Sequence, residues 1–435
     1  MKPRRAPWIL TGLVIAITAL LWAGAKLGGQ QPGFPPFWIA ASQLVSLESL
    51  ALMSIALLAG TRARMLEPFF GGLDGAIRFH RAVGPASVLL LVGHVLLLVI
   101  HWLSRGYPIL PQVIPFYAPE TRTPYVLTFW GLVVLGALAY SRSLKYEPWI
   151  WLHRLVGPLF VGSAVHLFVI GSSVRHYEPL RSWIALLVLV GVVAWFYRVV
   201  LFRRFGPRYE YEVGDVIHRN GGITDLVMRP VDRRMIYDPG TFVFIALRAA
   251  KGVSGELHPF SISSSPVERD LRLSIRRLGD WTRSMEKITP GARATLYGPF
   301  GIFTPNAFVK HRRLVLIGAG IGITPFLSML AFERTNNDFR RIWLYYIVPN
   351  ADDAAFEPEI RDTYLNTNSY IDYTLWETRK QGHIKARTIV DEVSPFGDYA
   401  VMLCGNARFV QGLKQQFQAL GVSPDRVIAE EFDFR

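Results

Sequence analysis

The chain has 435 residues, a formal net charge of +14 and 51% hydrophobic residues, which allows two or three domains. The basic excess lies in the first half, where residues 1–205 hold 18 Lys and Arg against 6 Asp and Glu, while the remainder holds 29 against 27. Basic residues placed between apolar segments belong to membrane topology, so we expect no nucleic-acid partner.

Six apolar segments of nearly 20 residues follow one another through the first half. They lie near residues 8–25, 37–60, 79–101, 124–141, 150–171 and 180–202. About 20 apolar residues let a helix cross the ~30 Å hydrocarbon core of a bilayer. Thirteen basic residues fall on one side of these spans and five on the other. The sequence therefore predicts a multi-pass plasma-membrane protein with both termini in the cytoplasm.

Four histidines lie in spans three and five and form a weak internal repeat. His80 and His153 each begin a similar His-Arg-x-Val-Gly-Pro run, and His94 and His166 follow them after 14 and 13 residues. Ionisable side chains inside a membrane are costly and mark functional sites. The histidines of each span are ~20 Å apart along the helix, too far to bind one metal. We therefore predict two b-type haems at different depths, one held by His80 with His153 and the other by His94 with His166.

The unequal spacing in the two spans has a consequence for helix geometry. A step of 14 residues leaves two side chains ~40° apart around a helix, whereas a step of 13 leaves them ~140° apart. Pro158 lies five residues after His153, so we predict that span five is distorted. Packing or interfacial histidines are the alternative. His101 is interpreted as interfacial. Glu48 is interpreted as a hydrogen-bonded side chain, with a proton path as its alternative.

Short strands separated by Gly, Pro and Asp turns follow the spans and predict a small antiparallel β-barrel over residues 206–308. The expected strands are 209–216, 222–229, 241–247, 271–276 and 294–297. This region contains the run His258-Pro259-Phe260-Ser261-Ile262-Ser263, then Arg276 and the pair Trp281-Thr282. Clustered hydroxyls with an arginine suit a phosphorylated ligand.

Strands alternating with helices predict a parallel-sheet α/β domain over residues 309–435. An apolar strand at 314–317 runs into a glycine-rich loop that contains Gly318, Gly320, Gly322 and Thr324. Such a loop between a strand and a helix lets a dinucleotide pyrophosphate approach the backbone, and Thr324 is a candidate helix cap. Further strands are expected at 341–348 and 399–403, the second leading to Cys404-Gly405-Asn406. Cys404 is the only cysteine, so the chain has no intrachain disulfide.

Taken in order, these motifs resemble those of the NADPH oxidase and ferric reductase superfamily. Within that superfamily, the chain looks like a bacterial NADPH oxidase-like member. The resemblance implies a multidomain membrane protein with a six-helix di-haem bundle (1–205), an antiparallel β-barrel FAD domain (206–308) and an α/β NAD(P)H domain (309–435).

The resemblance also implies roles for individual residues. The segment His258, Pro259, Phe260, Ser261, Ile262 and Ser263 would hold the flavin, with Ser261 near its reactive edge, while Arg276, Trp281 and Thr282 would bind the FAD pyrophosphate. Gly318, Gly320, Gly322 and Thr324 would hold NAD(P)H, with Cys404 and Gly405 beside the nicotinamide. Phe432 is preferred to Phe434 as the C-terminal aromatic that stacks on the flavin.

The coenzyme and the electron acceptor stay open. NADPH-using members carry a basic residue after the second dinucleotide strand, whereas this chain has Asp352 and Asp353 there, with Arg379 and Lys380 as possible replacements. The expected function is electron transfer from cytoplasmic NADPH or NADH through FAD and two haems to an acceptor on the outer face. Oxygen, giving superoxide, is preferred, and a ferric chelate is the first alternative. A haem-free, membrane-anchored flavin reductase is the second, and protein partners are unknown.

Overall fold

A computed structural model describes residues 5–27, 36–117, 122–141, 146–170, 172–248, 255–336, 340–365 and 370–431. The chain forms two compact units, one built mainly from residues before 205 and the other mainly from residues 205 onward.

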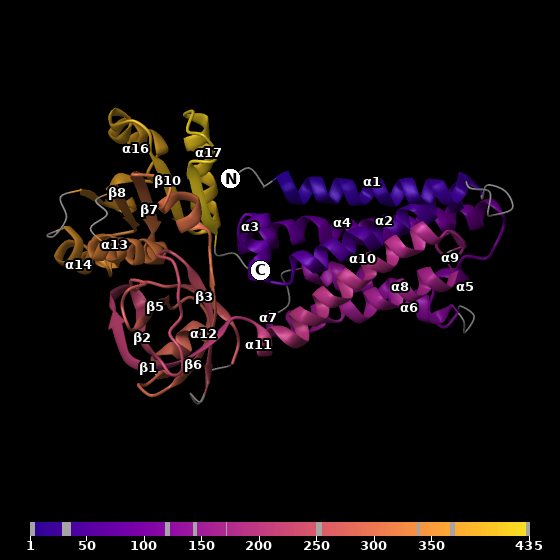
Figure 1. The fold of residues 1–435 in the computed structure, drawn as a ribbon, viewed down its shortest axis with the longest axis horizontal. Helices are drawn as coiled ribbons and strands as arrows, with labels where there is room; N and C mark the ends of the chain where they lie inside the picture. Colours follow the sequence, from indigo (N-terminus) through magenta and orange to yellow (C-terminus); the bar gives the residue numbers. More distant parts are fainter. Residues whose placement is uncertain are drawn as a thin grey trace. The chain divides into compact units, whose positions relative to one another are not determined.

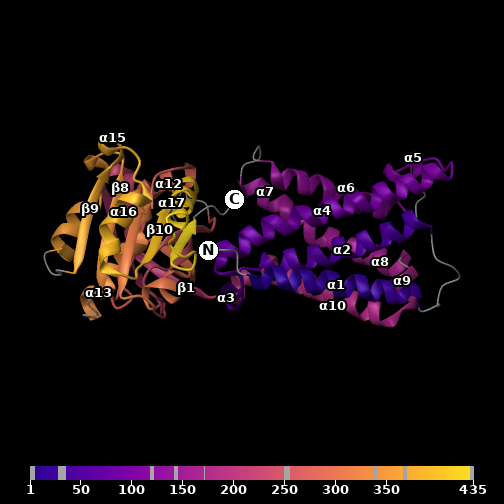
Figure 2. The same cartoon turned by 90° about the horizontal axis from the view of Figure 1, so that it is seen from above.

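The first unit is a bundle of long apolar helices (Figures 1 and 2). Its main helices are α1 (Arg5–Leu27), α2 (Phe37–Ala59), α4 (Leu73–Ser104), α6 (Thr123–Tyr140), α7 (Tyr146–Arg154) with α8 (Val156–Ile170), and α10 (Glu178–Phe196). Short helices α3 (Glu67–Phe70), α5 (Leu110–Val113), α9 (Ser172–His176) and α11 (Phe202–Phe205) connect or extend them. Within the described residues, six segments are long and apolar enough to cross a membrane, and this confirms the six predicted spans.

The fifth span is broken at Leu155, between α7 and α8, which confirms the predicted distortion. Pro158 has no backbone N–H to donate to the Arg154 carbonyl four residues earlier. The Trp195 indole of α10 donates to this carbonyl instead, at 2.9 Å. Trp195 packs so closely on Gly157 that a Cβ there would overlap the indole. A proline, a glycine and a tryptophan therefore set the helix break directly after His153.

In the second unit, the described residues between 208 and 300 form a six-stranded, fully antiparallel sheet that curls into a barrel. The strands are β1 (Arg208–Arg219), β2 (Ile223–Pro230), β3 (Phe242–Arg248), β4 (His258–Ser261), β5 (Leu271–Arg276) and β6 (Arg293–Phe300), in the order β4-β3-β6-β1-β2-β5. A bridge between Ile262 and Leu273 joins the two ends of this order. Sequence patterns did not predict β4. As an edge strand it tolerates Pro259, which cannot donate to a neighbouring strand.

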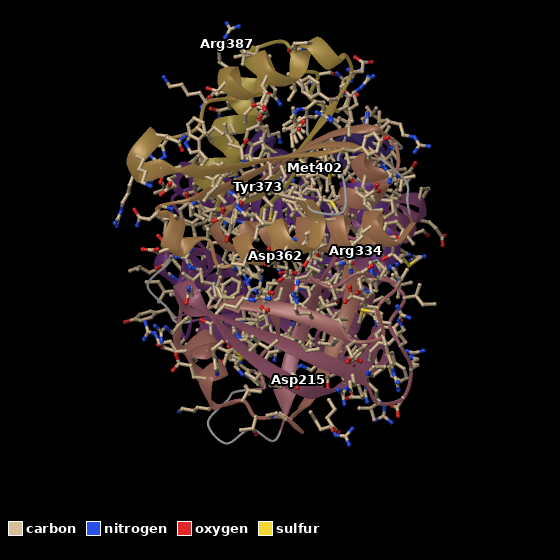
Figure 3. All side chains as sticks on the ribbon, turned by 90° about the vertical axis from the view of Figure 1, so that its left-hand side faces the viewer. Asp215, Arg334, Asp362, Tyr373, Arg387 and Met402 are labelled. Atoms are coloured by element: carbon tan, nitrogen blue, oxygen red, sulfur yellow. The ribbon has the colours of Figure 1, made fainter. Side chains whose placement is uncertain are left out.

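Among the described residues after 300, five strands form a parallel sheet. Its strands are β7 (Arg313–Ala319), β8 (Arg341–Val348), β9 (Ile371–Glu377), β10 (Ala400–Gly405) and β11 (Val427–Glu431), in the order β11-β10-β7-β8-β9. Helix α13 (Thr324–Asn336) packs on one face, and α16 (Ala386–Val393) and α17 (Ala407–Ala419) pack on the other. Figure 3 shows Met402 on this sheet and Asp215 on the barrel. The strand order reverses between β7 and β10, the point at which parallel sheets bind ligands at their carboxyl ends.

Candidate functional site

The structure brings His80 and His153 together in the helix bundle. Their ring centres are 5.9 Å apart and their planes are inclined by 83°. Two imidazoles on opposite sides of one metal, with metal–nitrogen bonds of about 2 Å, have ring centres about 6 Å apart. His153 also stacks on Trp149, with ring centres 5.2 Å apart. The spacing of the His80/His153 pair therefore fits two histidines that would bind one metal.

The two histidines of α4 are each oriented by a backbone carbonyl of α2. His80 Nδ1 lies 2.8 Å from the Ala56 carbonyl oxygen, and His94 Nδ1 lies 3.0 Å from that of Ser42. A carbonyl can only accept, so Nδ1 carries the proton and donates it. Nε2 then keeps its lone pair, and a second hydrogen bond of this kind is what usually orients a metal-ligating histidine.

These contacts belong to a regular register between α2 and α4. The Ser42 hydroxyl lies 2.7 Å from His94 Nδ1 and donates to the His94 carbonyl at 3.1 Å. Midway along, the Ser49 hydroxyl donates to the Ser87 carbonyl at 2.7 Å. Positions 42, 49 and 56 of α2 thus face positions 94, 87 and 80 of α4 in steps of seven residues. Sequence reasoning missed these α2 residues: small side chains at a seven-residue spacing indicate a close helix contact, but not which backbone carbonyl accepts the hydrogen bond.

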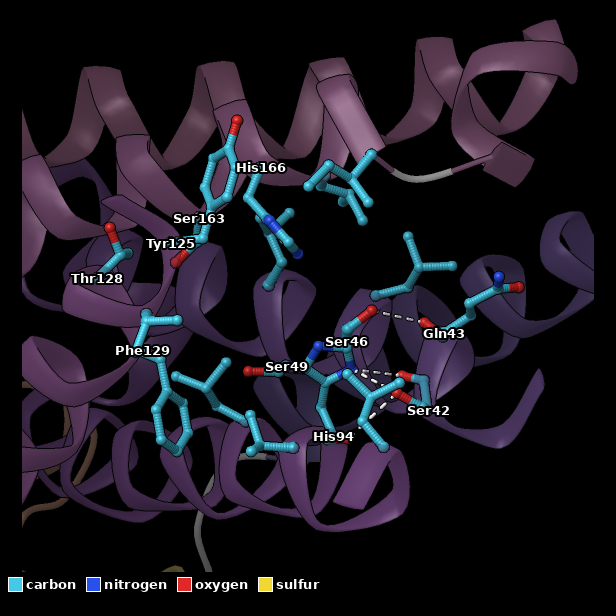
Figure 4. Close-up of a pocket in the computed structure, with 18 of the residues that line it drawn as sticks. Ser42, Gln43, Ser46, Ser49, His94, Tyr125, Thr128, Phe129, Ser163 and His166 are labelled. Atoms are coloured by element: carbon cyan, nitrogen blue, oxygen red, sulfur yellow. Dashed lines mark hydrogen bonds between the residues drawn. The ribbon is translucent and has the colours of Figure 1, made fainter. Parts of the chain in front are cut away.

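His94 and His166 line one cavity of about 440 Å³ between α2, α4, α6 and α8 (Figure 4). In the close-up, the two imidazoles point into the cavity from opposite sides. The lining mixes apolar side chains with many polar ones, and the volume lies within the roughly 300–1,000 Å³ of a cofactor site. These polar residues include Ser46, Gln112, Arg122, Tyr125, Thr128 and Ser163.

The histidines of the broken span have no such anchor in the described part of the chain. Nδ1 of His153 and Nδ1 of His166 are buried and lack a hydrogen-bond partner there. The His166 ring lies against Tyr125, with ring centres 4.6 Å apart. The cavity lies between His94 and His166, and the Nε2 atoms of His80 and His94 are free to bind a metal because their Nδ1 atoms are hydrogen-bonded. Together, the four imidazoles fit two flat, metal-centred groups such as haem b. His80 with His153 would hold one haem, and His94 with His166 the other.

In the barrel, the two predicted flavin motifs lie together. The His258 ring stacks on Trp281 with ring centres 4.1 Å apart, and Phe260 lies 5.8 Å from the same indole. Burial lowers the pKa of His258, against the opposing effect of Glu256, whose carboxylate is 2.9 Å from its Nε2. Thr282 Oγ1 accepts hydrogen bonds from the backbone N–H groups of residues 278 and 279 and so fixes the turn that carries Trp281.

The remaining predicted flavin residues lie in two places. Ser261, Ile262 and Ser263 are buried in the barrel wall, where the Ser263 hydroxyl is 3.0 Å from that of Ser274. Arg276 reaches the glycine loop, where its Nη1 would be 3.2 Å from a Cβ built on Gly320. The residue predicted to bind the FAD pyrophosphate thus lies against the glycine loop predicted to bind NAD(P)H.

The glycine loop lies at the strand-order reversal. Gly320 has φ +55°, a conformation that glycine adopts without strain. A Cβ on Gly318 would meet the Ile323 backbone, and one on Gly322 would overlap the Cys404 carbonyl. Thr324 begins α13, but its hydroxyl donates to the Ile321 carbonyl at 2.9 Å. The structure therefore does not show the predicted cap, in which this oxygen accepts from a helix N–H.

Cys404 is the second-last residue of β10 and lies beside Gly318 of β7, with Glu430 of β11 on its other side. Its side chain is fully buried, and burial together with the Glu430 carboxylate raises the pKa of the thiol. Glu430 also accepts a hydrogen bond from the Ile302 N–H at 2.9 Å and so links this edge of the sheet to the barrel. Sequence reasoning missed Glu430. Gly405 follows Cys404 directly.

The remaining predictions concern the C-terminal aromatic residue and the residues beside β8 that bear on the choice between NADPH and NADH. Phe432 and Phe434 lie outside the described residues. Beside β8, Asp353 accepts hydrogen bonds from Asn350, and Lys380 pairs with Glu377 at 2.8 Å. The Arg379 N–H donates to the Pro349 carbonyl at 3.1 Å, which places that residue beside the same loop.

The fold and these sites define a class of protein: a multi-pass membrane domain joined to a barrel and a dinucleotide-type parallel-sheet domain. Three family models match the chain, one after another along the sequence. They are the ferric reductase like transmembrane component (46–164), the FAD-binding domain (211–296) and the oxidoreductase NAD-binding domain (316–415).

Similar proteins agree with these matches. NADPH oxidase 1 of Mus musculus is 28% identical over 240 residues, 49% of this chain and 39% of that protein. Ferric reduction oxidase 4 of Arabidopsis thaliana is 25% identical over 285 residues, 62% of this chain and 37% of that protein. The chain therefore matches well under half of the length of either relative.

Among solved structures, a flavohemoglobin from Malassezia yamatoensis is similar in fold, with a TM-score of 0.52, 17% identity, and coverage of 90% of this chain and 98% of that one. The chain belongs to the NADPH oxidase and ferric reductase superfamily.

Proposed function

We propose that the protein transfers electrons from NADPH or NADH, by way of FAD and two b-type haems, to a small-molecule acceptor across the plasma membrane. Oxygen is the proposed acceptor and superoxide the product, with both chain termini on the cytoplasmic side. The observation that supports this most strongly is the placement of four histidines as two pairs, in the unit that carries the six apolar helices.

The side chains of this protein bind and orient the cofactors. When bound, FAD and haem iron supply hydride acceptance and one-electron transfer, so no side chain has to act as an acid or a base. His80 and His94 would present Nε2 to the metals because α2 holds their Nδ1 atoms. The glycine loop would admit the dinucleotide at the strand reversal, beside Arg276 and Cys404.

A ferric chelate is the second candidate acceptor. The specific observation in its favour is the similarity to ferric reduction oxidase 4, which is 25% identical over 62% of this chain. The same electron path would serve either acceptor, because the difference concerns only the last step.

Two assays on one membrane preparation separate these acceptors. With NADPH or NADH as donor, an oxidase reduces a superoxide trap, and superoxide dismutase abolishes the signal. A ferric reductase forms Fe²⁺ from a ferric chelate under anaerobic conditions at a comparable rate. The double variant His94→Ala, His166→Ala should lose either activity yet still reduce its flavin. Undiminished acceptor reduction by this variant would instead support the haem-free flavin reductase.

A further inference from the structure

A partly buried cluster of charges joins the barrel to the nucleotide domain. Glu359, in α14 (Glu357–Glu359), accepts from two arginines of the barrel. Its Oε1 is 2.7 Å from Arg272 Nη2, and its Oε2 is 3.0 Å from Arg272 Nη1 and 2.8 Å from Arg219 Nη2. The side chains of all three are less than one-fifth exposed. Arg272 and Glu359 therefore form a two-pronged pair that little solvent reaches.

The same arginine also holds the predicted flavin segment. Arg272 Nε donates to the Ser263 hydroxyl at 3.0 Å, and its Nη2 donates to the Ser263 carbonyl at 3.1 Å. One rigid guanidinium thus contacts the flavin segment on one side and the nucleotide domain on the other. A planar fork of donors suits this double role, whereas lysine could not reproduce it.

Arg219 reinforces the cluster. Its Nε is 2.6 Å from the fully buried Asp225 carboxylate, and its guanidinium lies 4.9 Å above the Phe356 ring, three residues before Glu359. Two arginines and two carboxylates balance in charge. Removing one member leaves a partly desolvated charge without its partner, which is more disruptive than loss of a fully exposed pair.

We propose that Arg272 and Glu359 are positioning residues that fix the nucleotide domain relative to the flavin segment. They would thereby set the distance between the nicotinamide, which donates the hydride, and the flavin, which accepts it. This inference rests on the proposed function, since it concerns the step in which NAD(P)H reduces FAD. A misplacement of 1 Å in such a step costs roughly a hundredfold in rate. Other contacts between the barrel and the nucleotide domain keep the two domains associated when the pair is broken. One of them is the hydrogen bond from Ser328 Oγ to the Ser264 carbonyl at 2.6 Å.

The test uses the full chain in nanodiscs and compares Glu359→Gln with two other variants. Glu359→Asp keeps the charge with a shorter reach. Glu357→Gln is the matched control, because the ion pair of Glu357 with Arg361 at 2.8 Å lies within the nucleotide domain and does not reach the barrel. Flavin reduction by NADPH or NADH is followed anaerobically by stopped flow, with the limiting rate and the half-saturating concentration determined separately. Thermal unfolding and FAD content are measured in parallel.

Glu359→Gln should lower the limiting rate of flavin reduction roughly ten- to a hundredfold. The half-saturating concentration and FAD content should stay unchanged, since Arg272 still holds Ser263. Glu359→Asp should recover part of the rate, and Glu357→Gln should match the wild type. A wild-type limiting rate in Glu359→Gln, or an equal loss in Glu357→Gln, would overturn the inference. So would loss of FAD or of folding in Glu359→Gln, which would make the pair structural.

Failure of the inference and failure of the proposed function give different results. If the wild-type flavin is not reduced by either nucleotide, the proposed function fails and the positioning role fails with it. If the wild type is reduced and Glu359→Gln is equally fast, only the positioning role is refuted.

Discussion

Replacing Gly318 with alanine tests how the glycine loop approaches its ligand. A Cβ at this position would lie 2.7 Å from the Ile323 Cα and 3.0 Å from the Ile323 backbone nitrogen. Ordinary contacts begin at 3.4 Å, so the new methyl group is too close to the Cα by about 0.7 Å. Because the opposing atoms belong to the backbone, no rotamer change can relieve the contact, and the loop itself has to move.

The expected cost follows from this overlap. Forcing one methyl group into a tightly packed site typically costs about 1–3 kcal/mol. At 1.4 kcal/mol for each factor of ten, this is a factor of about 5 to 150 in affinity when the strain falls on the nucleotide-bound conformation. We therefore expect Gly318→Ala to raise the half-saturating NAD(P)H concentration for flavin reduction by a factor in this range.

The assay is anaerobic flavin reduction over a range of nucleotide concentrations. Gly412→Ala is the control: it lies in α17 of the same domain, and a Cβ there would meet no atom within 4 Å. That substitution should leave nucleotide affinity unchanged and favour its helix by up to about 1 kcal/mol. Reduction of the haems by dithionite needs no nucleotide and should be normal in both variants. The reasoning fails if Gly318→Ala keeps the wild-type affinity or if Gly412→Ala loses as much.

Three further predictions concern single side chains. Trp195→Phe removes the hydrogen bond to the Arg154 carbonyl beside the helix break, and loss of such a bond typically costs about 0.5–1.5 kcal/mol, so the thermal midpoint of haem absorbance should fall; an unchanged midpoint would contradict this. Ser42→Ala removes one of the two acceptors at His94 Nδ1, so haem affinity should fall by about tenfold, the lower end for such supporting contacts, and equal haem retention on dilution would count against it. Since burial raises the pKa of the Cys404 thiol, alkylation at pH 8 should be much slower in the folded protein than after denaturation, and equal rates would refute the burial.

Sequence patterns predicted what depends on composition and local chemistry. Apolar runs located the spans, because a bilayer imposes a helix length. Pro158 indicated the break in span five, since a missing N–H acts on its own helix. The glycine loop could be placed at a strand end because its ligand chemistry requires that position.

What the sequence could not predict depends on contacts between distant elements. Ala56 orients His80 through a backbone carbonyl, and a carbonyl leaves no mark in the residue type. Glu359 looks like any helix-terminal acid until β1 and β5 are folded against it. Strand β4 contains a proline, which lowered its strand signal although an edge position tolerates it.

The central claim is that four histidines bind two b-type haems as two pairs. The most direct test is the dithionite-reduced minus oxidised spectrum of the purified protein, combined with haem quantification per chain. The wild type should show a low-spin b-type band and two haems. The double variant His94→Ala, His166→Ala should keep one haem, and His80→Ala, His153→Ala should keep the other. Absence of the band from the wild type, or two haems per chain in either double variant, would contradict the account.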